Sequence, residues 1–289
     1  MAGLIKNILW PTDFSAEGQE ALLYAGLFAQ TFSAGITALH VIPDLAPAFY
    51  ADSPVIAQEL SGRMAEITQK AQAQFKAMET KRGLTFKKAV IAEGSTAKKI
   101  VETAEKEKAD LIVMGKKGQS RLEKVLIGSV ANHVLRHSPV PVLITQKGKR
   151  PAGIKKILVP TDFAKEEDVE REFAWDLAQR FGASLTFLYV LELYGHEYRM
   201  VDHMFETALA RFKKRAHQAR TGITVSKDVT RAVTAAAGID EYSRERGFDL
   251  IVMATCARGL GRFFLGSTTE KVISHTGLPV FALPPHYCR

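Results

Sequence analysis

The chain is poor in cysteine and has no long hydrophobic run, and both absences narrow what it can be. Only two cysteines, Cys256 and Cys288, occur in 289 residues, and neither has a partner at metal-ligand spacing. A disulfide framework is therefore excluded. No apolar run approaches the ~20 residues of a membrane helix, and the apolar start is too short for a signal peptide. We expect a soluble, cytoplasmic protein with no membrane partner.

Common nucleotide-binding motifs are also missing. No Gly-x-x-x-x-Gly-Lys-Ser/Thr sequence occurs, and no Gly-x-Gly-x-x-Gly follows the first apolar run, which excludes a P-loop and the dinucleotide fingerprint. No Ser-Gly-Gly loop follows the first strand of either half, which counts against an ATP pyrophosphatase or a nucleotidyl transferase.

The net charge of +8 is spread along the chain. Residues 1–150 hold 20 Lys and Arg against 14 Asp and Glu, and residues 151–289 hold 19 against 17. Acids and bases alternate along helical stretches such as 98–108, as on a solvated helix face. Nucleic-acid binding is therefore not expected.

An internal repeat organises the chain. Lys-Asn-Ile-Leu-Trp-Pro-Thr-Asp-Phe-Ser at 6–15 recurs as Lys-Lys-Ile-Leu-Val-Pro-Thr-Asp-Phe-Ala at 155–164. Asp-Leu-Ile-Val-Met at 110–114 recurs at 249–253. Such self-similarity is the mark of a tandem duplication.

The second copy is ten residues shorter. The loss falls after Val190, where the first copy carries the turn-rich segment 43–54, a candidate surface loop or lid. We predict two domains, 1–147 and 154–289, with a linker around residues 146–153.

Within each copy, short apolar runs alternate with helical periodicity. Near-continuously apolar strands that alternate with helices predict a five-stranded parallel sheet covered on both faces, which is a doubly wound α/β fold. Ligands of such sheets bind beyond the carboxyl ends of the strands at the switch point. In the first copy the expected strands are 5–10, 36–42, 85–92, 111–115 and 140–145, and the expected helices are 16–32, 55–82, 96–108 and 129–137.

A glycine-rich stretch after the fourth expected strand has the outline of a phosphate site. Gly118 follows Gly115 after two residues, and nine residues separate Gly118 from the pair Gly128-Ser129, which opens a helix. Glycines let backbone N–H groups approach phosphate oxygens, and a helix start offers unsatisfied amides. A plain turn followed by a helix N-cap fits the same pattern. The basic residues near enough in sequence to screen an anion are Lys116, Lys117 and Arg121.

Asp13 follows the first expected strand. If that strand and the fourth are neighbours, Asp13 faces the glycine loop. A carboxylate repels phosphate, so its expected partners are ribose hydroxyls, adenine N–H groups or a Mg²⁺ that bridges phosphates. An N-cap role for Asp13, repeated by Asp162 in the second copy, stays open.

These motifs resemble the universal stress protein family, and the whole chain is similar to a tandem universal stress protein. The resemblance rests on the segments 11–15 and 110–115, the Gly-2x-Gly-9x-Gly-Ser loop, and His-Ser-Pro-Val-Pro-Val-Leu at 137–143. It implies two Rossmann-like domains of the adenine nucleotide alpha hydrolase-like type. Each would be a five-stranded parallel sheet of order 3-2-1-4-5 with helices on both faces.

The resemblance also implies that the first copy binds ATP, alone or with Mg²⁺. Pro11, Asp13 and Val41 would contact adenine and ribose, and the glycine loop would wrap the ribose and phosphates. The full set expected at the nucleotide is Pro11, Thr12, Asp13, Val41, Met114, Gly115, Lys117, Gly118, Gly128, Ser129 and Val130.

The second copy departs from this pattern. Ala254 and Ala257 stand at the first two glycine positions, and eight residues rather than nine precede Gly266. The added methyl groups fill space that a close phosphate needs. The copy is then either a structural partner or a weak site for a smaller anion, assisted by Arg258 and Arg262. The residues of that weak site would be Pro160, Asp162, Val190, Gly266, Ser267 and Thr268.

The remaining candidates do not make a metal site. His133 and His137 are four apart on a helix but have no evident third ligand. Cys256 is a reactive thiol or an ordinary loop residue, and His286 to Cys288 read as a frayed tail. We predict no metal site.

The sequence thus predicts a stress-response protein in which ATP is a regulatory or conformational ligand. Asp13 is the only acid expected near the phosphates, so hydrolysis or autophosphorylation would at most be slow. A pseudo-dimer that senses another ligand or none, and a slow nucleotide-dependent enzyme of the same superfamily, stay open. The resemblance implies that the two domains pair within the chain through strands 140–144 and 278–282; a homodimer stays open.

Overall fold

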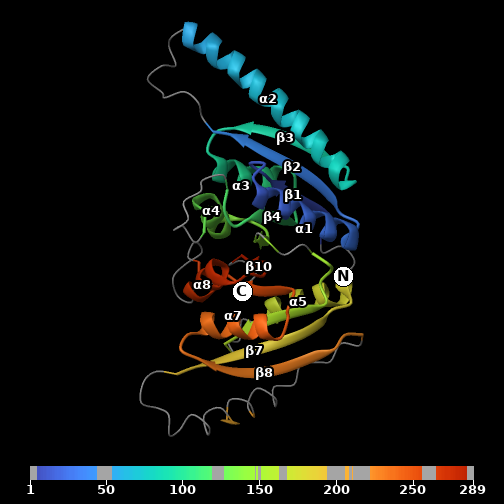
Figure 1. Ribbon diagram of the computed structural model, residues 1–289, viewed down its shortest axis with the longest axis vertical. Helices are drawn as coiled ribbons and strands as arrows, with labels where there is room; N and C mark the ends of the chain where they lie inside the picture. The colour runs from blue at the N-terminus through green and yellow to red at the C-terminus, as the bar shows by residue number, and fades with distance from the viewer. Residues whose placement is uncertain are drawn as a thin grey trace. The chain divides into compact units, whose positions relative to one another are not determined.

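The computed structural model describes residues 5–43, 54–118, 127–146, 148, 151–162, 168–193, 206–207, 210, 222–255 and 265–284. The chain divides into two compact units, Met1–Lys147 and Gly148–Arg289, which contain β1–β5 and β6–β10 respectively (Figure 1). None of the described helices has the length and apolar character that a membrane span requires. Predicted features outside the described residues are most of the loop 43–54, Arg121, Cys256, Ala257, Arg258, Arg262 and the tail 286–288.

Unit 1 is a parallel five-stranded sheet in the order β3-β2-β1-β4-β5, which confirms the predicted 3-2-1-4-5 order. Its strands are β1 (Asn7–Pro11), β2 (Gly35–Ile42), β3 (Lys88–Glu93), β4 (Leu111–Gly115) and β5 (Val142–Thr145). Its helices are α1 (Ala16–Phe32), α2 (Pro54–Arg82), α3 (Thr96–Lys106) and α4 (Ser129–His137).

Unit 2 repeats this topology, with strands in the order β8-β7-β6-β9-β10. The strands are β6 (Lys156–Thr161), β7 (Ser184–Glu192), β8 (Val225–Ala232), β9 (Leu250–Ala254) and β10 (Val280–Leu283). The helices are α5 (Asp168–Phe181), α7 (Ala235–Glu245) and α8 (Ser267–His275).

The core of unit 1 is built on the apolar central strands. β1 pairs with β4 in register Ile8 with Leu111, so both strands end at the same edge of the sheet. Trp10 is fully buried; its Nε1 donates to the Gly18 carbonyl of α1 at 2.9 Å, and its ring meets Phe75 of α2. α1 and α2 therefore share one face, while α3 and α4 pack against each other. Right-handed crossovers place that second pair on the opposite face.

Three strands of unit 1 begin later than predicted, at Asn7, Lys88 and Val142. Before β1, the backbone N–H groups of Lys6 and Asn7 donate to the Asp110 carboxylate at 2.8 and 2.9 Å. The Asp110 side chain thus takes the N–H groups of Lys6 and Asn7, while the Lys6 carbonyl still accepts from the Gly35 N–H at 2.9 Å. Apolar patterning does not distinguish a side-chain partner from a strand neighbour.

Helix α7 packs directly onto β7 through a glycine. A Cβ added to Gly238 would lie 2.7 Å from Val190 Cγ1 and 2.9 Å from Ala232 Cβ. Both distances are shorter than any normal carbon contact, so a larger residue must push the helix off the sheet.

We therefore expect Gly238→Val to destabilise the protein by about 1–3 kcal/mol, because overpacking strains the α7 and β7 contact. Gly277→Ala is the matched control in the same unit, since nothing lies within 4 Å of its added Cβ; its change should stay within about 0.5 kcal/mol. Urea unfolding followed by circular dichroism measures both. Equal midpoints for the two variants would contradict the packing argument.

Candidate functional site

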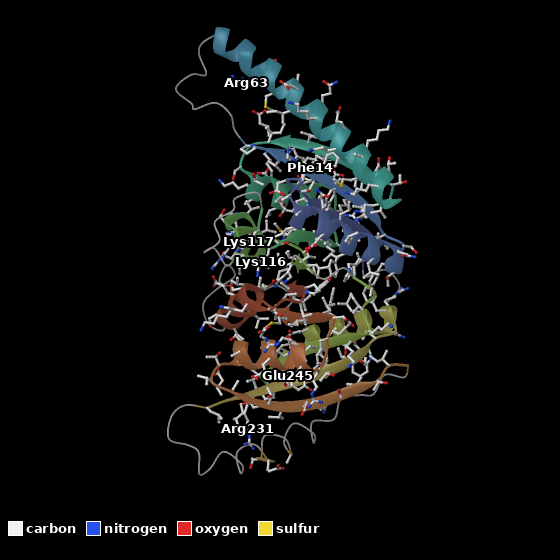
Figure 2. All side chains as sticks on the ribbon, in the orientation of Figure 1. Phe14, Arg63, Lys116, Lys117, Arg231 and Glu245 are labelled. Carbon is white, nitrogen blue, oxygen red and sulfur yellow. The ribbon has the colours of Figure 1, made fainter. Side chains whose placement is uncertain are left out.

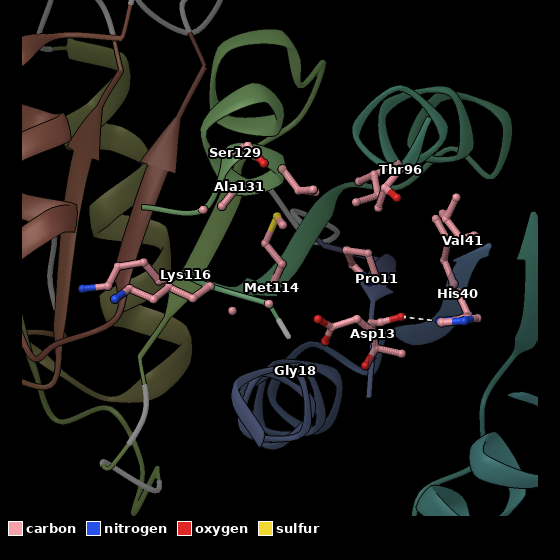
Figure 3. Close-up of a pocket in the computed structure, with 18 of the residues that line it drawn as sticks. Pro11, Asp13, Gly18, His40, Val41, Thr96, Met114, Lys116, Ser129 and Ala131 are labelled. Carbon is pink, nitrogen blue, oxygen red and sulfur yellow. Dashed lines mark hydrogen bonds between the residues drawn. The ribbon is translucent and has the colours of Figure 1, made fainter. Parts of the chain in front are cut away.

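A cavity of about 430 Å³ opens at the carboxyl ends of β1, β2 and β4, beside the first residues of α3 and α4 (Figure 3). It gathers residues that lie more than a hundred positions apart in the sequence. Every residue predicted for the nucleotide lines it: Pro11, Thr12, Asp13, Val41, Met114, Gly115, Lys117, Gly118, Gly128, Ser129 and Val130.

The turn after β1 orients Asp13. The Thr12 N–H donates to the Leu39 carbonyl at 2.8 Å, and the Ser15 N–H donates to Asp13 Oδ1 at 3.0 Å. The N-cap of α1 is Ser15, whose side chain accepts from the Gly18 N–H, so the alternative of Asp13 as N-cap is wrong. The Asp13 carboxylate supports the turn and points its other oxygen elsewhere.

That other oxygen faces the glycine loop. A Cβ added to Gly118 would lie 2.6 Å from Asp13 Oδ2, which leaves no room for a side chain. A Cβ on Gly115 would lie 3.0 Å from the Glu17 Cβ, and one on Gly128 would lie 3.2 Å from the Lys116 carbonyl oxygen. The glycines thus let the loop approach the start of α1.

Glu17 is a second acid at this edge, and the expectation that Asp13 is the only one is wrong. Its Oε2 accepts the backbone N–H of Lys117 at 2.7 Å and so ties the loop to the first turn of α1. The available signal was its place in the first turn of α1, directly after the Asp13 turn, but sequence position alone does not give the bond to Lys117.

The basic residues of the loop do not act alike. Lys116 Nζ donates to Gln146 Oε1 at 2.9 Å, and Figure 3 shows this side chain extended away from the cavity interior. Burial, and then the neighbouring charge of Lys117, lower the pKa of Lys116, while Glu17 opposes the shift. Both lysines lie together after β4 (Figure 2); Lys116 lines the cavity, but its Nζ is engaged by Gln146, which argues against the predicted screening role for it.

Two helix starts border the cavity. Gly128, the N-cap of α4, makes no side-chain capping bond, and its own N–H donates to the Lys116 carbonyl at 2.9 Å. Ser95, the N-cap of α3, likewise makes no side-chain capping bond. The early amides of a helix have no intrahelical partner and carry partial positive charge. Each helix start therefore favours an anion beside it.

Sequence reasoning missed other lining residues. His40 lies between two buried residues of β2, and its Nδ1 contacts the Thr12 carbonyl oxygen at 2.8 Å. Its ring also meets Phe14 at 4.8 Å between centroids. Strand order could have given the edge of the sheet on which the missed residues lie, but not the directions of their side chains. The other missed residues are Gly18, Leu39, Pro43, Thr96, Ile100 and Ala131.

The residues of the predicted weak second site also lie at the carboxyl ends of their strands. Pro160 ends β6 together with Thr161, Asp162 is exposed beyond it, and Val190 is buried in β7. Gly266 is the N-cap of α8, followed by Ser267 and Thr268.

Two carboxylates hold backbone amides at this edge of unit 2. Glu192 accepts from the Ala235 N–H at the start of α7, at 2.6 Å, and Glu170 accepts from the Ala254 N–H at 2.9 Å. Unit 2 therefore supplies its own anions to amides at the ends of β9 and the start of α7.

His133 and His137 stack on α4, with ring centroids 4.0 Å apart. Burial, followed by the charges of His137 and Lys98, lowers the pKa of His133. Across the described residues, no group of three His, Cys, Asp or Glu side chains is placed to hold a metal ion.

Comparisons with known proteins identify the family. The family model described as the Universal stress protein family matches residues 4–146 and 153–284. A universal stress protein of Methanocaldococcus jannaschii is 37% identical over 147 residues, which cover 51% of this chain and 85% of that protein. The crystal structure of a universal stress protein from Archaeoglobus fulgidus is 27% identical, covers 96% of this chain and 98% of its own, and superposes with a TM-score of 0.66. A universal stress protein solved in complex with cAMP is 25% identical, covers 50% of this chain and 100% of its own, and has a TM-score of 0.34. Because the family model matches nearly the whole chain in two copies, the chain belongs to the universal stress protein family.

Proposed function

We propose that unit 1 binds ATP and that the protein uses the nucleotide as a regulatory or conformational ligand in a stress response. The observation that carries this proposal is the convergence of the Asp13 turn, the glycine loop and the start of α4 on one cavity of about 430 Å³. Nucleotides bind doubly wound sheets at this place, beyond the strand ends at the switch point.

The two ends of the cavity suit the two ends of a nucleotide. The end near Pro11, Leu39 and Val41 is largely apolar and can enclose a base. The end near Gly128 and Ser129 offers helix amides, which favour phosphate oxygens. Asp13 lies between them and accepts from donors such as ribose hydroxyls.

Mg²⁺ would enter with the phosphates. Asp13 Oδ1 already accepts from the Ser15 N–H, and Glu17 Oε2 from the Lys117 N–H. Mg²⁺ keeps several waters and is commonly held by one or two carboxylates together with substrate phosphates. The carboxylate oxygens at this edge fit a Mg²⁺ ion carried by ATP, and the ion would neutralise the negative charge of the phosphates.

Unit 2 is proposed as a structural partner that takes no nucleotide. Val190, the counterpart of Val41, is covered by α7 through Gly238. Ala254 and Ala257 stand where unit 1 has Gly115 and Gly118, so each adds a methyl group to the loop. The two units would pair within the chain, as the family resemblance implies.

The proposal is tested by nucleotide content and by calorimetry. Acid-denatured protein should release adenine nucleotide, and nucleotide-depleted protein should bind ATP with Mg²⁺ at about one equivalent per chain, because such sites are few per protein. A flat titration with depleted, folded protein would overturn the proposal. Two equivalents would overturn the assignment of unit 2 as a structural partner.

Gly118→Val should weaken ATP binding by about tenfold or more, which is a loss of roughly 1.4 kcal/mol. The added side chain meets Asp13 Oδ2 and must displace either the loop or the carboxylate. Gly62→Ala on α2 is the control, since nothing lies within 4 Å of its Cβ. ATP calorimetry on both variants gives the comparison, and parental affinity in Gly118→Val would refute the placement of the loop.

Hydrolysis of bound ATP should be slow, at least about a hundredfold below the ~1–100 s⁻¹ of kinases. Asp13 is assigned to the nucleoside in this proposal and Glu17 ties down the Lys117 N–H, so neither is assigned to activate a water molecule. Single-turnover assays with labelled ATP measure this rate. A rate in the kinase range that Asp13→Ala abolishes would show that the site is catalytic.

A further inference from the structure

The hydrogen-bond ladder between β1 and β2 ends one residue pair earlier than the corresponding ladder of unit 2. Its last pair is Pro11 with Leu39, and the Thr12 N–H still donates to the Leu39 carbonyl at 2.8 Å. In a continuing parallel ladder, the Thr12 carbonyl would next accept the N–H of Val41. The Thr12 carbonyl instead meets Nδ1 of His40 at 2.8 Å (Figure 3).

Unit 2 provides an internal comparison. Tyr189 stands where unit 1 has His40, and Thr161 stands where unit 1 has Thr12. There the ladder between β6 and β7 runs one pair further, through Thr161 with Tyr189. In a parallel ladder of this register, that pair requires the Val190 N–H to donate to the Thr161 carbonyl.

The backbone of Val41 faces the cavity because of strand parity. Odd-numbered residues of β2 bond toward β1, as Gly35 does with Lys6, and even-numbered ones bond toward β3, as Ile42 does with Gly94. Val41 is odd-numbered and lies beyond the last pair with β1. It is 7% exposed and lines the cavity, and buried backbone polar groups need partners.

We propose that His40 is a positioning residue for the nucleotide base: by capping the Thr12 carbonyl, it keeps the Val41 N–H and C=O out of the ladder and available to the ligand. This inference rests on the proposed function and deepens it. A carbonyl oxygen only accepts, so His40 carries its proton on Nδ1. Phe14 packs against the imidazole ring and holds its plane.

The backbone N–H and C=O of Val41, which face the cavity, select a base edge by their chemistry. The N–H donates to a ring nitrogen, and the C=O accepts from an adjacent exocyclic amino group. A 6-aminopurine presents this acceptor and donor side by side. The 6-amino group should therefore contribute to affinity only while Val41 stays outside the ladder.

Two substitutions separate this role from packing. His40→Tyr installs the residue of unit 2 and removes the Nδ1 donor, which lets the Thr12 carbonyl accept from Val41. His40→Asn keeps an N–H donor near the position of Nδ1. The ligands are adenosine and purine riboside, which differ only in the 6-amino group, and ATP is titrated in parallel.

Calorimetry on the parent should show adenosine binding roughly threefold to tenfold more tightly than purine riboside, the worth of one hydrogen bond. His40→Tyr should bring this ratio to about one, and His40→Asn should restore it. A merely structural role would weaken both ligands equally and leave the ratio unchanged. His40→Phe replaces His40→Tyr if thermal melting shows that the tyrosine variant does not fold.

The outcomes separate this inference from the proposed function. A parent that binds neither ATP nor adenosine overturns the proposed function itself. A parent that binds ATP but shows no preference for adenosine overturns only the inference. So does an unchanged ratio in His40→Tyr or a lost ratio in His40→Asn.

Discussion

The adjacency of β1 and β4 is the constraint on which the site depends. Their register places Leu9 beside Ile112, so the chain leaves both strands at one edge of the sheet. The helix after β1 and the one after β4 cover opposite faces, which opens a gap between the two exits. Asp13 and Gly118 meet in that gap although a hundred residues separate them, and a side chain on Gly118 would close it.

Much of this could be predicted from the sequence because its causes are local or periodic. Apolar runs that alternate with helical spacing fixed the layers, and the duplicated Pro-Thr-Asp segment and the glycine spacing placed Asp13 and Gly118 at the same edge. The duplication also meant that each inference about one copy could be compared with the other. The strand order followed from the family resemblance and is confirmed.

The missed residues act through side-chain bonds to distant backbone. Glu17 accepts from Lys117 across a hundred positions, and His40 meets Thr12 across twenty-eight. Such bonds have no period and no spacing rule, so they become visible only when the strands are placed. The same holds for Asp110, which anchors the start of β1 and shortens the predicted strand. Polar residues near strand ends were therefore the weak point of the sequence reasoning.

Comparison of the two copies distinguishes the residues that support the fold, which both units share, from the residues beside the cavity, which differ. Asp249 holds the backbone N–H groups of Lys155 and Lys156 as Asp110 does at the start of β1, so this anchor is present in both units. The residues beside the cavity differ, with Tyr189 in place of His40 and alanine in place of the first loop glycine. A duplicated sheet needs its anchors and buried strands in each copy to remain folded. The broken ladder and the bare glycine loop occur together in unit 1, the unit that we propose binds the nucleotide.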